Sequence, residues 1–216
     1  MTYGHFNLHD TSLVNRTFVT PPREGDTEKI SYASYCEQQG MTLLSAAPLS
    51  MGILTPQGPP EWHPASADLK EACRSVVQLC QEHQLDVTFL ATVFALAEPR
   101  IPCTILGMKD IAEIQAAQRA AQRIEDATES THQTDDQCMD TNDSHPSLRR
   151  LKAVLTDTEY LVTKQILDPT NGPFAKVWST ASNSDGESQF YKDWDGIAAV
   201  RDFWKQLPDV NVTEWQ

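Results

Sequence analysis

The amino-acid sequence predicts an α/β fold in which a small parallel sheet is followed by an acidic loop and a C-terminal α-helical extension. Helix and strand patterns alternate along residues 30–125, which is typical of chains that form parallel sheets. Beyond residue 125 the alternation stops, and an acidic segment precedes a further helical stretch. The length of 216 residues suits one large domain, or one domain with an appendage.

The first part of the chain divides into short elements separated by turn residues. The patterns predict, in chain order, a short strand and turn over 1–14, a loop over 17–29, a helix over 30–39, a strand over 41–47 that Pro48 ends, and a proline-rich loop over 49–64. Gly40 stands where a glycine that ends a helix is expected. The run over 41–47 is almost continuously apolar and follows a helix, which indicates a buried parallel strand.

Helices and one further strand follow the proline-rich loop. Apolar residues recur at spacings of three and four positions over 67–83, which predicts an amphipathic helix. Asp86 is placed to cap a second helix directly after it. A short strand over 103–106 leads into a last helix of this region, where Asp110 and Glu113 have the spacing of a capping box.

The remaining part of the chain has a different character. Seven acidic residues, and no Lys or Arg, fall within 125–143, so this segment is predicted to be solvated and disordered. Thr156 and Glu159 have the spacing of a capping box, and a last helix is expected over 197–206. The expected division is a barrel-like part over 1–125, an acidic disordered linker over 126–146 and a helical extension over 147–216.

The composition excludes several classes of partner. Asp and Glu outnumber Lys and Arg by 30 to 17, and the formal net charge of −13 argues against nucleic acid and anionic membranes. No apolar run approaches the roughly 18 residues that span a bilayer, and the N-terminal residues lack the features of a signal peptide. The five cysteines form no C-x-x-C pair, so reduced thiols in a cytoplasmic protein are the simplest account.

One stretch of the sequence is specific enough to indicate a family. It reads P-L-S-M-G-I-L-T over 48–55 and G-P-P-E-W-H-P-A over 58–65. Here the chain resembles the aldo/keto reductases, most closely the L-galactose dehydrogenase-like branch of that family. The resemblance continues through T-I-L-G-M over 104–108 and, more weakly, through the residues near the N-terminus, so that it covers about 3–125.

The resemblance implies a partial TIM (β/α)8 barrel. The matching segments correspond to the last three β/α units, whose loops in the family hold NAD or NADP at the carboxyl ends of the strands. A complete barrel has roughly 250 residues, more than this chain contains. By resemblance, the cofactor-binding residues are Leu49, Ser50, Gly52, Leu54, Gly107, Met108 and Lys109. A proline-terminated strand that opens into a loop of small residues also leaves backbone N–H groups free to face a pyrophosphate.

Three residues near these loops keep two interpretations each. Lys109 would either pair with a 2′-phosphate or remain a solvated lysine at the start of a helix. Trp62 and His63 would either line a substrate mouth or cap the rim of a barrel. His5 and His9 have a spacing that binds zinc on a helix, but they lie at a strand exit, so no metal site is predicted.

The sequence also departs from the family. The departures in the cofactor pocket are Tyr3, Ala46, Glu113, Ala116 and Ala117, which stand where relatives place other side chains. The catalytic Asp, Tyr, Lys and His of the family come from its first four strands, and these strands have no counterpart in this sequence. We therefore assign no catalytic residue.

Three functional hypotheses follow. The leading one is the C-terminal part of an NAD(P)-dependent oxidoreductase that transfers hydride at a sugar or aldehyde carbonyl, present as a fragment that is inactive alone. The alternative is a non-enzymatic protein-interaction module, a barrel fragment whose acidic segment and aromatic-rich tail bind a protein partner. A third is a half-barrel completed by self-association or by a separately encoded N-terminal half, because three parallel strands cannot close a barrel.

Overall fold

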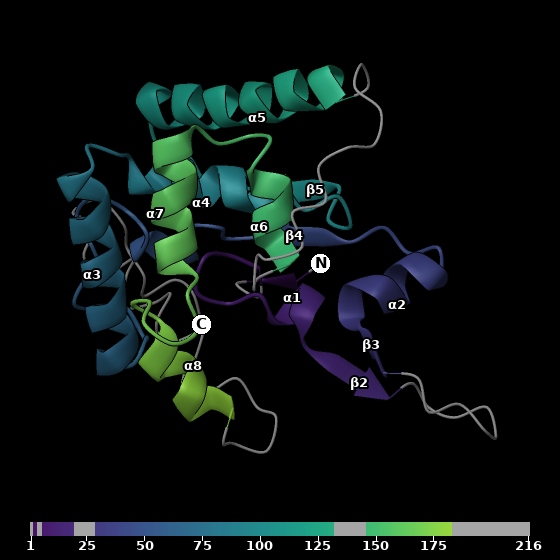
Figure 1. The fold of residues 1–216 in the computed structure, drawn as a ribbon, viewed down its shortest axis with the longest axis horizontal. Coiled ribbons are helices and arrows are strands. Elements are labelled where there is room, and N and C mark those ends of the chain that lie inside the picture. Colours follow the sequence, from purple (N-terminus) through teal and green to yellow (C-terminus); the bar gives the residue numbers. More distant parts are fainter. Residues whose placement is uncertain (1, 4–5, 20–28, 132–145, 183–216) are drawn as a thin grey trace, which may run out of the picture.

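The computed structural model describes residues 2–3, 6–19, 29–131 and 146–182 (Figure 1). Within these ranges, a short parallel sheet, a two-stranded antiparallel ribbon and the helices α1 to α8 follow one another. The architecture is therefore mixed helix and strand with a small parallel sheet, as the alternation of patterns predicts.

Three short strands form the parallel sheet. β1 (Thr2–Tyr3) and β5 (Cys103–Ile105) pair in parallel with the two edges of β4 (Leu44–Ala46). The buried parallel strand predicted over 41–47 is confirmed but shorter. Met41 is 47% exposed, so pairing begins only where the chain enters the interior.

The loop predicted over 17–29 is wrong at both of its ends. β2 (Thr17–Val19) and β3 (Lys29–Ser31) pair in antiparallel fashion, with Phe18 opposite Ile30. Threonine, valine, isoleucine and aromatic residues favour the extended backbone, and this pairing gives them a partner strand. The buried Ile30 therefore belongs to a strand and not to the first turn of the following helix.

Two short helices accompany this ribbon. α1 (Ser12–Asn15) follows the loop after β1, and α2 (Tyr32–Gln38) follows β3. The side-chain oxygen of Ser31 accepts the N–H of Ser34 at 3.1 Å and so caps α2. Gly40 ends this helix with φ +66°, the left-handed conformation that the sequence predicts there.

The two helices predicted after the proline-rich loop are confirmed. α3 (Ala67–Glu82) is capped by Ser66, and α4 (Val87–Leu96) is capped by Asp86, whose carboxylate accepts the N–H of Thr88 at 2.8 Å. Their apolar faces supply a large part of the core. The three- and four-residue spacing located the first helix and the Asp86 cap the second, whereas the Ser66 cap was not predicted.

Helix α5 (Ile111–Thr131) is longer than predicted. It continues beyond residue 125 into the expected linker, where the side-chain amide of Gln122 donates to the Asp126 carboxylate one turn later at 3.0 Å. The rest of that linker, over 132–145, lies outside the described residues. Only one of the two hydrogen bonds of the predicted capping box is present: the Asp110 carboxylate accepts the N–H of Glu113 at 2.9 Å. The Glu113 carboxylate accepts the N–H of Lys109 at 2.8 Å, instead of the N–H of Asp110 that a capping box requires.

Two helices open the C-terminal region. α6 (Pro146–Leu151) precedes α7 (Asp157–Ile166). The capping box predicted at the start of α7 is confirmed, because the N–H of Glu159 donates to the Thr156 hydroxyl oxygen and the N–H of Thr156 donates to the Glu159 carboxylate.

Helix α8 (Ala175–Ser182) is not among the predicted helices. It follows a tight turn at Gly172, where a Cβ atom would lie 2.5 Å from the carbonyl oxygen of Asp168, so only glycine fits. The helix predicted over 197–206 lies outside the described residues. Within the described ranges, no helix has the length and apolarity needed to cross a membrane.

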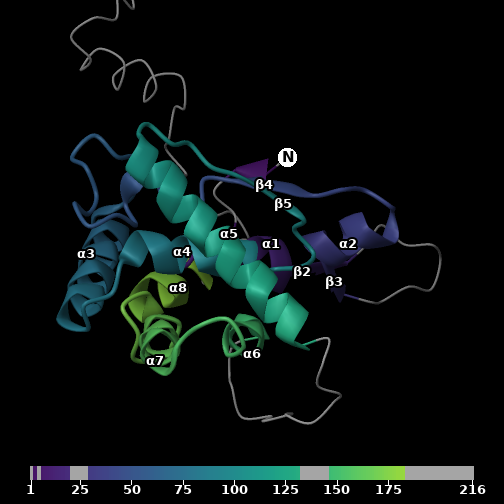
Figure 2. The ribbon, with the colours of Figure 1, turned by 90° about the horizontal axis from the view of Figure 1, so that it is seen from above.

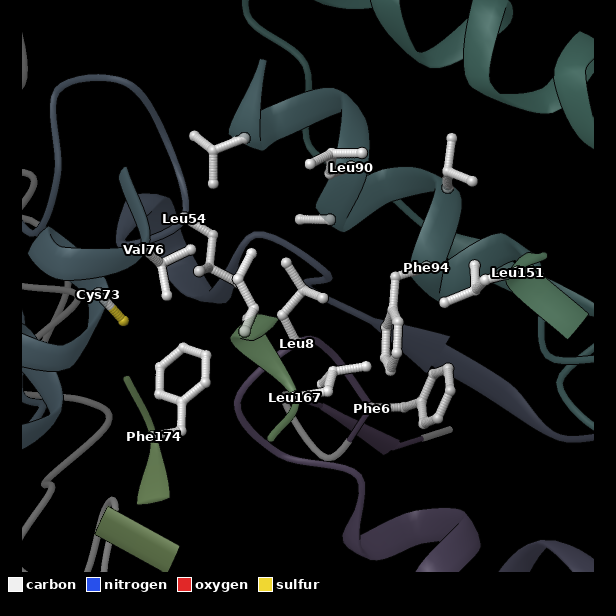
Figure 3. Close-up of a cluster of buried hydrophobic side chains, with 14 of the residues drawn as sticks. Phe6, Leu8, Leu54, Cys73, Val76, Leu90, Phe94, Leu151, Leu167 and Phe174 are labelled. Atoms are coloured by element: carbon white, nitrogen blue, oxygen red, sulfur yellow. The ribbon is translucent and has the colours of Figure 1, made fainter. Parts of the chain in front are cut away.

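One hydrophobic core joins the C-terminal helices to the rest of the molecule. Figure 2 shows β4 and β5 along one side, α6 and α7 along the opposite side, and α4 between them. The rings of Phe6 and Phe94 stack with centroids 5.3 Å apart. Leu151, Leu167 and Phe174 belong to the same buried cluster (Figure 3). The described part of the extension is therefore packed into the core.

Candidate functional site

A cavity of about 930 Å³ lies where the chain leaves the parallel strands β4 and β5. One wall comes from the loop between Ala47 and Trp62, and the other from the turn between Leu106 and Lys109 together with Glu113 of α5. Ligands of α/β proteins bind outside the carboxyl ends of parallel strands, because the loops that leave the strands converge there. This cavity is therefore the candidate binding site.

The loop wall has an unusual backbone. Ala47, Ser50, Met51 and Gly52 have φ values of +59°, +47°, +56° and +96°, all in the left-handed region. This conformation costs about 1–2 kcal/mol for each residue other than glycine. Such strained positions persist only where the surrounding structure holds them, and they are frequent at binding sites.

The loop does not present a row of free backbone donors. The N–H of Ser50 donates to the carbonyl of Ala47 at 2.9 Å, and the N–H groups of Gly52 and Leu54 both donate to the carbonyl of Leu49, at 3.0 and 3.3 Å. The expectation of free N–H groups is therefore wrong at these three positions, because the left-handed residues fold the loop into consecutive tight turns.

The second wall carries the charged groups of the cavity. The Lys109 ammonium lies 3.5 Å from the Glu113 carboxylate, and the Lys109 side chain is 81% exposed. Glu113 therefore neutralises part of the positive charge that Lys109 brings to the cavity. Gly107 and Met108 complete this wall and are exposed.

Trp62 and His63 occupy different places. Trp62 lines the cavity, but His63 is only 2% exposed and lies beneath the loop. Its Nε2–H donates to the carbonyl oxygen of Ser50 at 2.9 Å, and its Nδ1 accepts the N–H of Ala65 at 3.0 Å. Burial lowers the pKa of His63 to about 4, so the ring is neutral near pH 7.

The Ser50 side chain is held from the other side by the loop after β1. The amide Nδ2 of Asn7 donates to the Ser50 hydroxyl at 3.1 Å, and Nε2 of His9 lies 2.6 Å from the same oxygen. A serine beside a histidine can form a nucleophile and its base. Here Ser50 is 1% exposed and His9 is fully buried, so substrate has no access and the pair is structural.

The structure brings together most of the residues that the resemblance singles out. Those that line the cavity are Leu49, Gly52, Gly107, Met108, Lys109 and Trp62. Ser50, Leu54 and His63 are buried instead beneath the loop wall. Sequence reasoning missed the contacts of Asn7 and His9 with Ser50. The only sequence signal for them is a pair of polar residues among apolar ones just after the first strand.

The described residues gather no metal site, and two of their cysteines are unreactive thiols of the core. No three His, Cys, Asp or Glu side chains gather as ligands within the described ranges. Burial raises the pKa of the Cys73 thiol and raises that of Cys80 to about 11, so both are inert thiols in the core.

Comparison with known proteins gives a consistent result. A sequence profile of the Aldo/keto reductase family matches residues 17–137. L-galactose dehydrogenase of Arabidopsis thaliana is 32% identical over 125 residues, which cover 58% of this chain and 34% of that protein. D-arabinose 1-dehydrogenase of Saccharomyces cerevisiae is 33% identical over 119 residues, which cover 54% of this chain and 31% of that protein. The chain thus spans about a third of the length of these curated relatives.

Proposed function

The chain belongs to the aldo/keto reductase family, and from this premise we propose that its cavity binds a nicotinamide dinucleotide as the C-terminal part of an L-galactose dehydrogenase-like oxidoreductase. The substrate class would be a sugar or another aldehyde. The observation that carries the proposal is the cavity itself, since its walls contain residues that the family resemblance assigns to the cofactor. Its volume of about 930 Å³ lies at the upper end of the range usual for ligand sites, about 300–1,000 Å³.

The residues of the cavity suit a partly charged and partly flat ligand. The ammonium of Lys109 provides a positive charge for a phosphate, and the Trp62 ring provides an apolar surface on the opposite wall. When bound, the dinucleotide would supply the hydride for carbonyl reduction. The compact loop wall and the Glu113 carboxylate both limit how strongly an anion can bind.

The cavity does not supply an acid–base group for the reaction. Among the described residues that line it, the titratable side chains are those of Lys109 and Glu113, and these two form an ion pair. Reduction of a carbonyl needs a proton donor at the carbonyl oxygen. We therefore propose that this chain binds the cofactor and is inactive without residues supplied from outside it.

The Glu113 carboxylate also bears on the choice of cofactor. If a 2′-phosphate were placed beside Lys109, it would add negative charge close to Glu113. We accordingly expect NADPH to bind no more tightly than NADH. The alternative function, a protein-interaction module, depends on the acidic segment, which lies largely outside the described residues. Absence of nucleotide binding by the folded chain would favour this alternative.

Calorimetric titration of the purified chain with NADH and NADPH at low salt tests the proposal. We expect saturable binding that weakens by up to roughly fivefold in Lys109→Met, because an exposed charge contact is lost. Lys152→Met is the matched control. It removes the same charge from an exposed position directly after α6, a helix on the side of the fold opposite β4 and β5 (Figure 2), and should leave the affinity unchanged. A folded chain that binds neither nucleotide would reject the proposal and favour the interaction module.

A further inference from the structure

We propose that helix α8 positions the loop wall of the cavity through a chain of contacts from Trp178 to His9 to Ser50. This helix lies beyond residue 137, where the match to the family ends. The inference rests on the proposed function only for the identity of the ligand, because the contacts themselves can be tested without it.

The first contact fixes the loop after β1 to the C-terminal helix. The indole Nε1–H of Trp178 donates to the carbonyl oxygen of His9 at 2.8 Å. The ring of Phe174, which is fully buried, lies with its centroid 6.0 Å from that of His9 and 5.7 Å from that of Trp178. Lys176 of the same helix pairs with Asp68 of α3 at 2.9 Å, which holds α8 from its exposed side.

The second contact passes from His9 to the loop wall. Nε2 of His9 lies 2.6 Å from the hydroxyl oxygen of Ser50. The backbone N–H of His9 donates to Oδ1 of Asn7 at 3.0 Å, and Nδ2 of Asn7 donates to the same hydroxyl oxygen at 3.1 Å. Asn7 and His9 therefore bind Ser50 as one unit, and a shift of the His9 backbone moves both contacts.

The third step leads from Ser50 to the cavity surface. Ser50 precedes Met51 and Gly52, which line the cavity, and all three have positive φ. A left-handed backbone is unfavourable for Ser50 and Met51, which are not glycines. This segment therefore keeps its conformation only while contacts with its surroundings hold it. The contacts from Asn7, His9 and His63 to Ser50 hold the segment in this conformation from beneath the loop wall.

Spatial continuity alone does not demonstrate coupling, so the test compares two substitutions on α8. Trp178→Phe removes the indole donor and keeps an aromatic ring. Val177→Ala is the matched control, because Val177 is buried on the same helix and its truncation also lowers stability. The readouts, in the full chain, are the backbone amide signals of Met51 and Gly52 by nuclear magnetic resonance, the affinity for NADH and the melting temperature.

We expect Trp178→Phe to shift the two amide signals and to weaken NADH binding about threefold to tenfold, the loss of one hydrogen bond. Val177→Ala should lower the melting temperature without either effect. Unchanged signals in Trp178→Phe, or equal effects in both variants, would overturn the inference. If the amide signals shift in Trp178→Phe but neither the parent chain nor the variants bind NADH, the proposed function is wrong. The inference that α8 positions the loop wall is then still supported.

A second variant covers the case in which Trp178→Phe does not fold. Ser50→Ala removes the hydroxyl group at the other end of the chain of contacts and leaves α8 intact. The same coupling then predicts a shift of the Trp178 indole N–H signal, measured without nucleotide. An indole signal identical to that of the parent chain would show that Ser50 and Trp178 are independent, and the inference would be wrong.

Discussion

Two buried histidines hold the loop wall as neutral rings. Burial lowers the pKa of both His9 and His63 from 6.5 to about 4, although Asp10 raises that of His9 and the hydrogen bond to Ser50 raises that of His63 in part. Each ring is bonded to a different atom of Ser50. A proton on either ring would place an additional charge beneath the cavity, where water cannot solvate it.

These two rings predict a stability that falls in mild acid. Between pH 6.5 and 4, the histidines bind protons in the unfolded chain but not in the folded one, so acid favours unfolding. The free energy of unfolding should decrease as the pH falls through this window, by up to about 1.4 kcal/mol per pH unit for each histidine. Urea titrations at a series of pH values measure this slope.

Substitutions identify which histidines cause the slope. His63→Gln should reduce it, because the amide does not titrate. His83, which is exposed at the end of α3, provides the control for the exchange of histidine for glutamine, and the slope should fall more in His63→Gln than in His83→Gln. A urea midpoint that stays constant from pH 7 to 5 in the parent chain would contradict the prediction.

At the scale of single residues, the sequence predicted the residues that line the cavity better than the buried contacts that support its loop wall. Leu49, Gly52 and Lys109 could be placed because a local motif carries them. The contact of His9 with Ser50 joins residues 41 positions apart, and no local pattern encodes such a pair. The left-handed backbone at Ser50 was equally hidden, since serine has no preference for positive φ.

At the scale of elements, one buried carboxylate ties the helices together. Glu98, just after α4, accepts hydrogen bonds from Arg100 at 2.7 and 3.1 Å and also binds Arg150 of α6. Burial alone would raise the pKa of Glu98, but the two guanidinium groups hold it below its usual value. The carboxylate therefore remains charged and joins α4 to the C-terminal region.

Glu98→Gln is predicted to destabilise the fold by about 2–4 kcal/mol, because it leaves two arginines facing a neutral amide in a partly buried site. Urea unfolding at pH 7 measures the loss. Glu71→Gln is the matched control, since Glu71 pairs with Arg74 at 2.8 Å on an exposed helix face. It should cost less than about 1 kcal/mol. Equal losses in the two variants would show that Glu98 does not join α4 to the C-terminal region.

The elements differ in how well local patterns predicted them. α3, α4 and α7 combine regular apolar spacing with a side-chain cap, and both signals are local. β2 and β3 are three residues each, and their pairing across the intervening segment creates them. α8 has only eight residues, and its packing against Phe174 and α3 stabilises it more than its own sequence does.

At the scale of the whole molecule, the parallel sheet formed by the described residues is open. β5 is paired along one edge only within the described residues. The side chains of Ile105 in this strand and of Ile111 and Ile114 at the start of the next helix, α5, are 42%, 73% and 50% exposed. Relatives are about three times as long as the part matched here. In a closed barrel a further strand and helix would cover such an edge, and an unpaired strand is a template for association.

This open edge predicts that the isolated chain associates with itself through β5 and the start of α5. Sedimentation over a wide concentration series should show a mass that rises above the 24.1 kDa of the monomer. The double variant Ile111→Lys and Ile114→Lys should remain monomeric, because two charges would be buried in the contact. Leu161→Lys is the control: Leu161 is 64% exposed on α7, away from this edge, and its variant should associate like the parent chain. A parent chain that stays monomeric, or a Leu161→Lys variant that also loses association, would show that this edge is not the contact surface.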